Sequence, residues 1–397
     1  MDSILLYLII IIEAIFIIKI SKFFVEKIFY YFYSILLILT FVIRPLIISY
    51  YDVMMYFFDL KEGVDNVVLL YTIYFNAVLI SLLLVHSRNY INYTKYLYKQ
   101  ENFKINSILL FLVIILSLIN ILIAYYNGPG LVTTLVSSSL LLFLLNYWLF
   151  SDDKTIFKVI ILSFGLISAS INGRTFPVLM LILILTTLKI SLNLSRAIKY
   201  LLLISIIIII TVTLDQNRFI LQGQDFNFPD LFNFVGMLVN ATYAFSFYDA
   251  MLSLFSLNFT PTFGADFFRT ALVLFPRAFF PDKPAIYGTE LEFTDLITNY
   301  DASTFIPSFV GISYFWFGYA GIIFGPVILV IGVAIIARFT KILRLNNARD
   351  LIFVLVSFKI FRSGFDWIFL YSFFVILPIV LSDRFIWNYC ITNRNKV

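Results

Sequence analysis

Cysteine, histidine and charged residues are all scarce in this chain. Its 397 residues include one cysteine, Cys390, and one histidine, His86. A single cysteine excludes an intrachain disulfide, and these two residues cannot form the Cys/His cluster that holds structural zinc. Charged residues make up 13% of the chain, against about 25% in soluble domains. So few charges cannot cover a soluble protein of this size, which excludes soluble enzymes and nucleic-acid-binding domains.

Hydrophobic residues are abundant instead, at 61% of the chain, and the mean hydropathy is +0.98. Stretches such as Leu201–Ile210 lack the strand-like alternation of a membrane β-barrel. Because about 20 apolar residues cross a bilayer as a helix, the sequence predicts an all-α polytopic membrane protein with about 11 (10–12) transmembrane helices. The predicted spans are residues 3–20, 29–50, 66–86, 106–126, 131–150, 156–172, 176–193, 197–214, 309–337, 350–364 and 367–382.

Lysine and arginine are distributed unevenly between the two sets of loops. Nineteen of the 28 basic residues fall in one set, and the positive-inside rule places that set in the cytoplasm. The N-terminus is then predicted on the outer side and the C-terminus in the cytoplasm. The basic pI, near 9.0, reflects this bias rather than a nucleic-acid partner.

One outer loop, residues 215–308, is far longer than the others, and a loop of this length in a compact protein is usually functional. Within it, Leu231–Phe259 is apolar and long enough to cross the membrane, yet it carries Asn233, Asn240 and Asp249 and has no basic flank. Residues 260–308 carry more acidic than basic side chains, so nothing favours a cytoplasmic position. We interpret 231–259 as a re-entrant or interfacial helix within a single membrane domain, 1–397.

Nine basic residues fall outside the cytoplasmic loops, and six of them are arginines. Charge near membrane depth is costly and is usually retained for function, and the planar guanidinium matches the oxygens of a diphosphate. This favours an anion-binding site at the outer membrane interface. The alternative is that these cations reach lipid phosphates or pair with local acids. The nine residues are Arg44, Lys61, Arg174, Arg218, Arg269, Arg277, Lys283, Lys359 and Arg362.

Two segments have distinctive local patterns. Residues 276–284, PRAFFPDKP, contain three prolines that restrict the backbone, and they place two cations beside aromatic rings that can stack on sugars. Residues 305–321 contain FIPS and FGYAG, and no charge occurs from 302 to 337. Gly318, Gly321 and Gly325 follow helical spacing there, which predicts a smooth face for close helix packing.

Acidic residues of the outer loop are the candidate general bases, because a base must reach the attacking hydroxyl. Among them we favour Glu290, which follows the proline-rich segment, with Asp266 as a second candidate catalytic residue. The chain has no D-x-D motif, so we expect arginine rather than a metal to neutralise a bound diphosphate. Glu13 interrupts the first span; we favour a residue that faces the helix bundle or extends to the membrane interface, and the alternative is an intramembrane functional acid.

These segments resemble the Wzy-type O-antigen and oligosaccharide repeat-unit polymerases. The resemblance implies a GT-C-like integral membrane glycosyltransferase in the bacterial inner membrane, with residues 215–308 in the periplasm. It covers most of the chain in topology but only short stretches in sequence. Those stretches are Arg44-Pro45, Asn172-Gly173-Arg174, Arg218, PRAFFPDKP at 276–284, the FIPS to FGYAG run at 305–321, and Arg362 to Asp366.

The family's activity implies that the protein joins undecaprenyl-diphosphate-linked oligosaccharide units into O-antigen or capsule-type polysaccharide. A hydroxyl of the acceptor attacks the anomeric carbon of the donor, and undecaprenyl diphosphate leaves. The resemblance also implies no cofactor, and a chain-length regulator and a flippase as partners. Many relatives carry an acid where this chain has Ile312, which is a departure from the pattern. The resemblance assigns substrate binding to Arg174, Arg218, Arg277 and Lys283, and the charge pattern adds Arg44, Arg269 and Arg362.

Two other functions remain open. An O-antigen ligase, or another lipid-linked glycosyltransferase, would catalyse the same type of reaction. Such ligases have a functional histidine in the outer loop, whereas His86 is predicted at the cytoplasmic end of a span. A lipid-linked oligosaccharide flippase or other transporter would place polar sites near the bilayer midplane, often across repeated halves. Here the unusual charges gather at the outer rim, and no repeat is visible.

Overall fold

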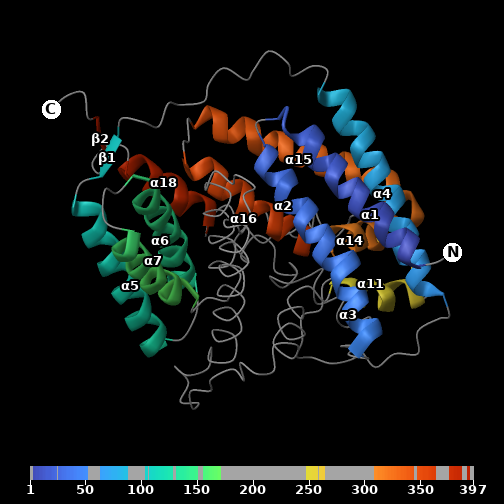
Figure 1. The fold of residues 1–397 in the computed structure, drawn as a ribbon, viewed down its shortest axis with the longest axis horizontal. Coiled ribbons are helices and arrows are strands. Elements are labelled where there is room, and N and C mark those ends of the chain that lie inside the picture. The colour runs from blue at the N-terminus through green and yellow to red at the C-terminus, as the bar shows by residue number, and fades with distance from the viewer. Residues whose placement is uncertain are drawn as a thin grey trace, which may run out of the picture. The chain divides into compact units, whose positions relative to one another are not determined.

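The computed structural model is helical apart from one pair of very short strands among the residues that it describes (Figure 1). The described residues are 3–24, 26–51, 63–87, 103–105, 107–127, 131–150, 155–170, 247–257, 259–263, 308–343, 347–363, 375–386 and 391–393. The helices are α1 Ser3–Ser21, α2 Lys27–Ile38, η1 Leu39–Ile43, α3 Arg44–Tyr51, α4 Val64–Ser87, α5 Ser107–Asn127, α6 Leu131–Phe150, α7 Thr155–Ser170, α11 Phe247–Ser256, α14 Phe309–Phe317, η6 Gly318–Ala320, α15 Gly321–Ile342, α16 Asn347–Ser363 and α18 Leu377–Phe385. The strands β1 Phe103–Ile105 and β2 Ile391–Asn393 pair antiparallel.

Within this described part, four stretches are long and apolar enough to cross a membrane: Ile4–Ser21, Lys27–Tyr50, Val64–His86 and Phe309–Ile342. Each lies on a predicted span, so the helical architecture is confirmed, and the length and apolar composition of these helices suggest a membrane protein. Helices α5, α6, α7 and α16 also fall on predicted spans. Predicted spans 176–193 and 197–214 lie outside the described residues, and the total of about 11 spans stays a prediction.

Contacts divide the chain into two compact units, which we describe separately. Unit 1 contains α1 to α4, α11, α14, α15 and the C-terminal part of α16. Unit 2 contains α5 to α7, the start of α16, α18 and the two strands. The limits are Met1–Tyr96, Thr242–Leu343 and Val356–Leu370 for unit 1, and Leu97–Ala241, Arg344–Leu355 and Tyr371–Val397 for unit 2.

Helix α1 shows how an almost uniformly apolar span divides between two environments. Leu6, Ile10, Ala14 and Ile17 form one fully buried stripe, at the spacing that keeps side chains on one helix face. This helix packs against α2 and α4. Apolar side chains on other faces of α1, such as that of Phe16, are exposed, as expected of a helix that contacts lipid.

The second span is interrupted in its middle. Helix α2 is followed by a π-helical turn, η1, and then by α3, which begins with Arg44 and Pro45. Proline has no N–H to donate, and its ring clashes with the carbonyl four residues earlier, here that of Phe41. A wider π turn accommodates this defect, and such turns are frequent at functional sites. The sequence therefore places Arg44 where the helix changes its hydrogen-bonding pattern.

The span Phe309–Ile342 is also interrupted. Helix α14 ends at Gly318, whose φ of +58° is a conformation that favours glycine, and α15 begins at Gly321. A methyl group on Gly321 would meet the carbonyl of Ser313 and the hydroxyl of Tyr71, and one on Gly325 would meet Phe75. The predicted close-packing face is thus confirmed at Gly321 and Gly325, whereas Gly318 serves the change of direction.

Replacement of Gly321 by alanine is expected to destabilise the protein by about 1–3 kcal/mol, as overpacking of a tight core does. The added methyl has a backbone carbonyl against it, which cannot rotate away as a side chain would. Thermal unfolding of the purified protein in detergent measures the effect. Ile335→Ala, at an exposed position of the same helix, is the matched control, and an equal loss in both variants would contradict the packing argument.

In unit 2, helices α5, α6 and α7 pack against one another (Figure 1), and a polar contact joins them. The buried amide of Asn120 on α5 donates to the hydroxyl of Ser137 on α6 at 3.0 Å and to the carbonyl of Ser168 on α7 at 2.8 Å. Hydrogen bonds of this kind join helices where apolar surface gives no preference over lipid. Strand β1 pairs with β2, with Phe103 opposite Asn393. These strands were not predicted, because three residues are too few to show a two-residue period.

Candidate functional site

Helix α11 is the described part of the apolar segment 231–259, within the loop that is predicted to lie on the outer side. Every residue from Phe247 to Phe255 is buried, and the helix contacts α4, α14 and η1. Its ten residues extend about 15 Å, roughly half of the hydrocarbon thickness of a bilayer. The rest of 231–259 falls largely outside the described residues, so its re-entrant or interfacial character stays a prediction.

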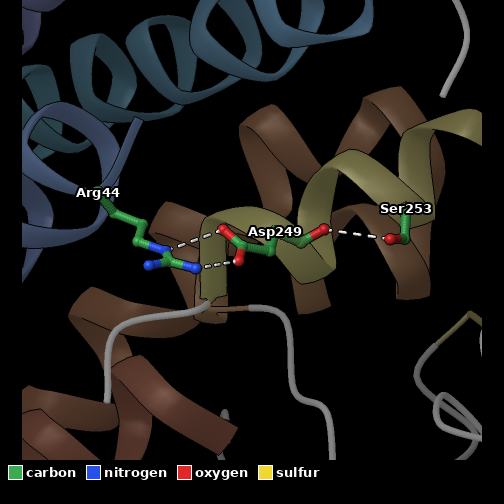
Figure 2. Close-up of polar contacts among 3 residues, drawn as sticks. All are labelled: Arg44, Asp249 and Ser253. Carbon is green, nitrogen blue, oxygen red and sulfur yellow. Dashed lines mark hydrogen bonds and ion pairs between the residues drawn. The ribbon is translucent and has the colours of Figure 1, made fainter. Parts of the chain in front are cut away.

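A buried ion pair joins α11 to the interrupted second span (Figure 2). Arg44 donates from Nη2 to Asp249 Oδ2 at 2.6 Å and from Nε to Asp249 Oδ1 at 3.2 Å. Both side chains are 0% exposed. Two parallel bonds between a guanidinium and a carboxylate give a strong and well-oriented contact. Such geometry is what offsets the desolvation of two buried charges, so the pair fixes α11 against the start of α3.

Aromatic rings from four segments meet at the other end of α11, and we call this group the Tyr314 cluster: Tyr71, Phe255, Phe259, Tyr314 and Tyr319. The Phe255 and Tyr314 rings stack with their centroids 3.8 Å apart, and Tyr71 contacts both edge-on. Phe259 and Tyr319 add further edge contacts to Tyr314. Tyr319 is the exposed member of the cluster. Because Tyr314 contacts both Phe255 of α11 and Tyr319, the cluster packs α11 against the FGYAG segment.

The chain that follows α11 is held against the end of α14. The amide N–H of Phe263 donates to the carbonyl of Trp316 at 2.7 Å, and that of Thr262 donates to the carbonyl of Phe315 at 3.4 Å. Carbonyls at the C-terminus of a helix lack partners within it, so this segment supplies the missing donors. Phe263 has a φ of 51°, uncommon for a residue with a side chain.

The residue that precedes the C-terminal motif, Arg362 to Asp366, also contacts α11. Phe361 contacts Phe247 of α11 edge-on, with centroids 5.9 Å apart, and contacts Tyr33 of α2 at 5.5 Å. Arg362 is the next residue of α16 and is half-buried. Asp366, the last residue of the stretch that Arg362 begins, lies outside the described residues.

Most of the predicted site residues cannot be located in the described part of the chain. Arg44 and Arg362 are described; Arg44 is paired with an acid, and its contact with a substrate stays a prediction. Ile312, at which the sequence departs from the Wzy-type pattern, is buried in α14. The predictions that lie outside the described residues concern Arg174, Arg218, Asp266, Arg269, Arg277, Lys283 and Glu290.

Asp249 is the residue whose role sequence reasoning missed. It appeared only as a polar interruption of an apolar segment, and its partner lies 205 positions away. A signal was nevertheless present, because a lone acid and a lone arginine at membrane depth each require a partner of opposite charge. In the described ranges, no three His, Cys, Asp or Glu side chains are grouped so that they could hold a metal ion. The chemistry of the described site is therefore that of one ion pair and several aromatic rings.

Comparisons with known proteins give no assignment. No family model and no curated protein matches the chain, and no solved structure matches its fold. The functional argument therefore rests on the residues of this chain and on the motifs that resemble the Wzy-type polymerases.

Proposed function

We propose that the chain is an integral membrane glycosyltransferase that joins undecaprenyl-diphosphate-linked oligosaccharide units at the outer face of the bacterial inner membrane. A hydroxyl oxygen of the acceptor unit forms a bond to the anomeric carbon of the donor unit. The bond from that carbon to the diphosphate breaks, and undecaprenyl diphosphate leaves. The hydroxyl proton passes to a base, for which Glu290 and Asp266 are the candidates.

The observation that carries the proposal is the convergence of separate motif segments on α11. Arg44 of the Arg-Pro motif binds Asp249 of this helix. Tyr314, within the 305–321 run, stacks on Phe255. Phe361, which precedes Arg362, packs on Phe247. The Arg-Pro motif, the 305–321 run and the residue that flanks the C-terminal motif are far apart in the chain, and their contact with one short buried helix supports a shared site.

The electrostatics of the reaction agree with the residues available. Negative charge develops on the leaving diphosphate, and preorganised donors stabilise such charge most where water is excluded. Arginine binds diphosphate oxygens through two parallel N–H groups. In this proposal Asp249 is a positioning residue, because it holds the Arg44 guanidinium in one orientation. The remaining cations of the outer loop bind the diphosphate and sugars.

The size distribution of surface polysaccharide in cells that lack the gene tests this function. We expect the long-chain ladder to disappear while core carrying a single repeat unit remains, and the intact gene to restore the ladder. Loss of the single unit as well would contradict polymerisation and would indicate ligation or translocation. In a second arm, the purified protein with lipid-linked repeat units is expected to produce a ladder together with undecaprenyl diphosphate.

A further inference from the structure

An acidic side chain lies near the middle of the first membrane span. Glu13 is in the third turn of α1, with eight residues of the helix after it, so about 12 Å of helix separates it from the nearer end. Its side chain belongs to the buried face, at 8% exposure, while Ile12 and Phe16 beside it are exposed. A carboxyl group at this depth is costly to retain and usually marks a function.

Two further polar side chains connect to Glu13 from neighbouring helices. The amide of Asn76 on α4 donates from Nδ2 to Glu13 Oε2 at 3.3 Å. The hydroxyl of Tyr33 on α2 donates to Asn76 Oδ1 at 3.2 Å. Tyr33 and Asn76 are fully or almost fully buried. The three residues form a continuous hydrogen-bonded chain across α2, α4 and α1, and α1 packs on both of the other two helices.

The surroundings of Glu13 favour a neutral carboxyl. Among the described residues no lysine or arginine forms an ion pair with it, and the Asn76 amide is its one hydrogen-bond donor. An ionised carboxylate accepts several hydrogen bonds, and an uncompensated charge in an apolar interior is strongly disfavoured. A protonated carboxyl needs fewer partners and carries no charge.

The charged side chains of the helices packed with α1 lie at helix ends: Lys19 in the last turn of α1, and Glu26 and Lys27 at the start of α2. The other titratable side chains of α1, α2 and α4, besides Tyr33, are the phenols of Tyr7, Tyr30, Tyr31, Tyr71 and Tyr74. Tyr33 faces it from α2 through Asn76. On α4, Asp65 is in the first turn and His86 in the last, and His86 stacks on Phe24. The residues of η1, LTFVI, include no titratable side chain. No neighbouring charge of the described bundle therefore competes for the proton.

We propose that Glu13, Asn76 and Tyr33 form an intramembrane proton-binding site, in which the carboxyl of Glu13 binds and releases one proton. Asn76 orients the carboxyl, and Tyr33 holds the amide of Asn76. Glycosyl transfer at the outer face requires no such site, so the inference is independent of the proposed function. A purely structural contact between helices would be served equally well by glutamine, and this difference makes the proposal testable.

Infrared difference spectra of the full-length protein in nanodiscs, wild type minus Glu13→Gln, test the proposal directly. At neutral pH we expect a carboxylic-acid C=O stretching band that shifts in D₂O. Raising the pH is expected to replace it reversibly with carboxylate bands. Tyr33→Phe is expected to shift the band. The Asn76 Oδ1 atom then loses the hydroxyl that donates to it, so the Asn76 amide is held less firmly against the carboxyl of Glu13. Carboxylate bands already present at neutral pH, or an acid band that no pH change removes, would overturn the proposal.

Labelling with dicyclohexylcarbodiimide gives an independent readout. This apolar reagent takes the proton of a carboxylic acid on its nitrogen, and the carboxyl oxygen bonds to its central carbon, so only the protonated form reacts. We expect label on the peptide that contains Glu13, its loss in Glu13→Gln, and its retention in the control Asp65→Asn. Protection by sodium ions at constant pH would reveal a metal-cation site instead and would overturn the assignment.

Discussion

Replacing Asp249 by alanine is expected to destabilise the protein by about 3–5 kcal/mol, the cost of removing one partner of a buried ion pair. The carboxylate of Asp249 accepts two N–H groups of Arg44, and both side chains are completely buried. The variant keeps the guanidinium charge in the same interior but removes the acid that balances it. The midpoint of thermal unfolding in detergent, together with the yield of folded protein, measures this loss.

The chain offers a matched control for this experiment. Arg349 and Asp350 form an ion pair at 3.3 Å whose side chains are about one third exposed, and such pairs contribute about 0–1 kcal/mol. Asp350→Ala should therefore leave stability nearly unchanged. The double variant Arg44→Met with Asp249→Leu should recover much of the loss, since apolar replacement of a buried pair is often tolerated. Wild-type stability of Asp249→Ala would refute the structural role of the pair.

Replacing Arg277 by alanine is expected to abolish extension of the polysaccharide while the protein still accumulates in the membrane. In the proposed reaction this arginine stabilises charge on the leaving diphosphate, and loss of one such donor lowers kcat by about 10²–10³-fold. A decrease of that size would reduce the ladder of surface polysaccharide to very short chains. The length distribution and the amount of membrane-bound protein are measured in the same cells.

Two further variants define what the Arg277 result means. Arg277→Lys keeps the charge but loses the planar guanidinium, so only partial extension is expected if two parallel bonds to phosphate matter. Arg338→Ala removes an exposed arginine from α15, on the predicted cytoplasmic side, and should leave the ladder normal. A near-normal ladder from Arg277→Ala would refute its assignment to the substrate.

Sequence reasoning succeeded where one physical requirement acts alone. The first span was predicted at 3–20 and α1 extends over Ser3–Ser21, because crossing a bilayer demands a continuous apolar length. The same requirement located α4 and the helices from Phe309 to Ile342. It could not show that the second span contains η1, because hydropathy does not report how the backbone adjusts to Pro45.

The site was harder to predict because its contacts connect distant positions. Arg44 was singled out as a charge that the positive-inside bias leaves unexplained, yet its partner on α11 depends on tertiary packing. The sequence alone does not decide which face of α1 carries Glu13. The structure places Glu13 on the face toward the bundle, where the amide of Asn76 donates to it. Spacing along one helix shows which face a residue occupies, but not which residue of another helix meets it.

The contacts around α14 bring together the two ends of a long chain segment. Phe263 is bonded to Trp316 near the end of α14, and Ser308 immediately precedes its start. Phe263 and Ser308, the residues on either side of segment 264–307, therefore lie within about 12 Å of one another, which is the length of that helix. The entropy of closing such a segment grows only slowly with its length, by about 0.6 kcal/mol for each doubling. The scaffold can consequently accept exchange of the whole segment as a cassette. Under the proposed function, such exchange would let substrate preference diversify without disturbing the helices at its two ends.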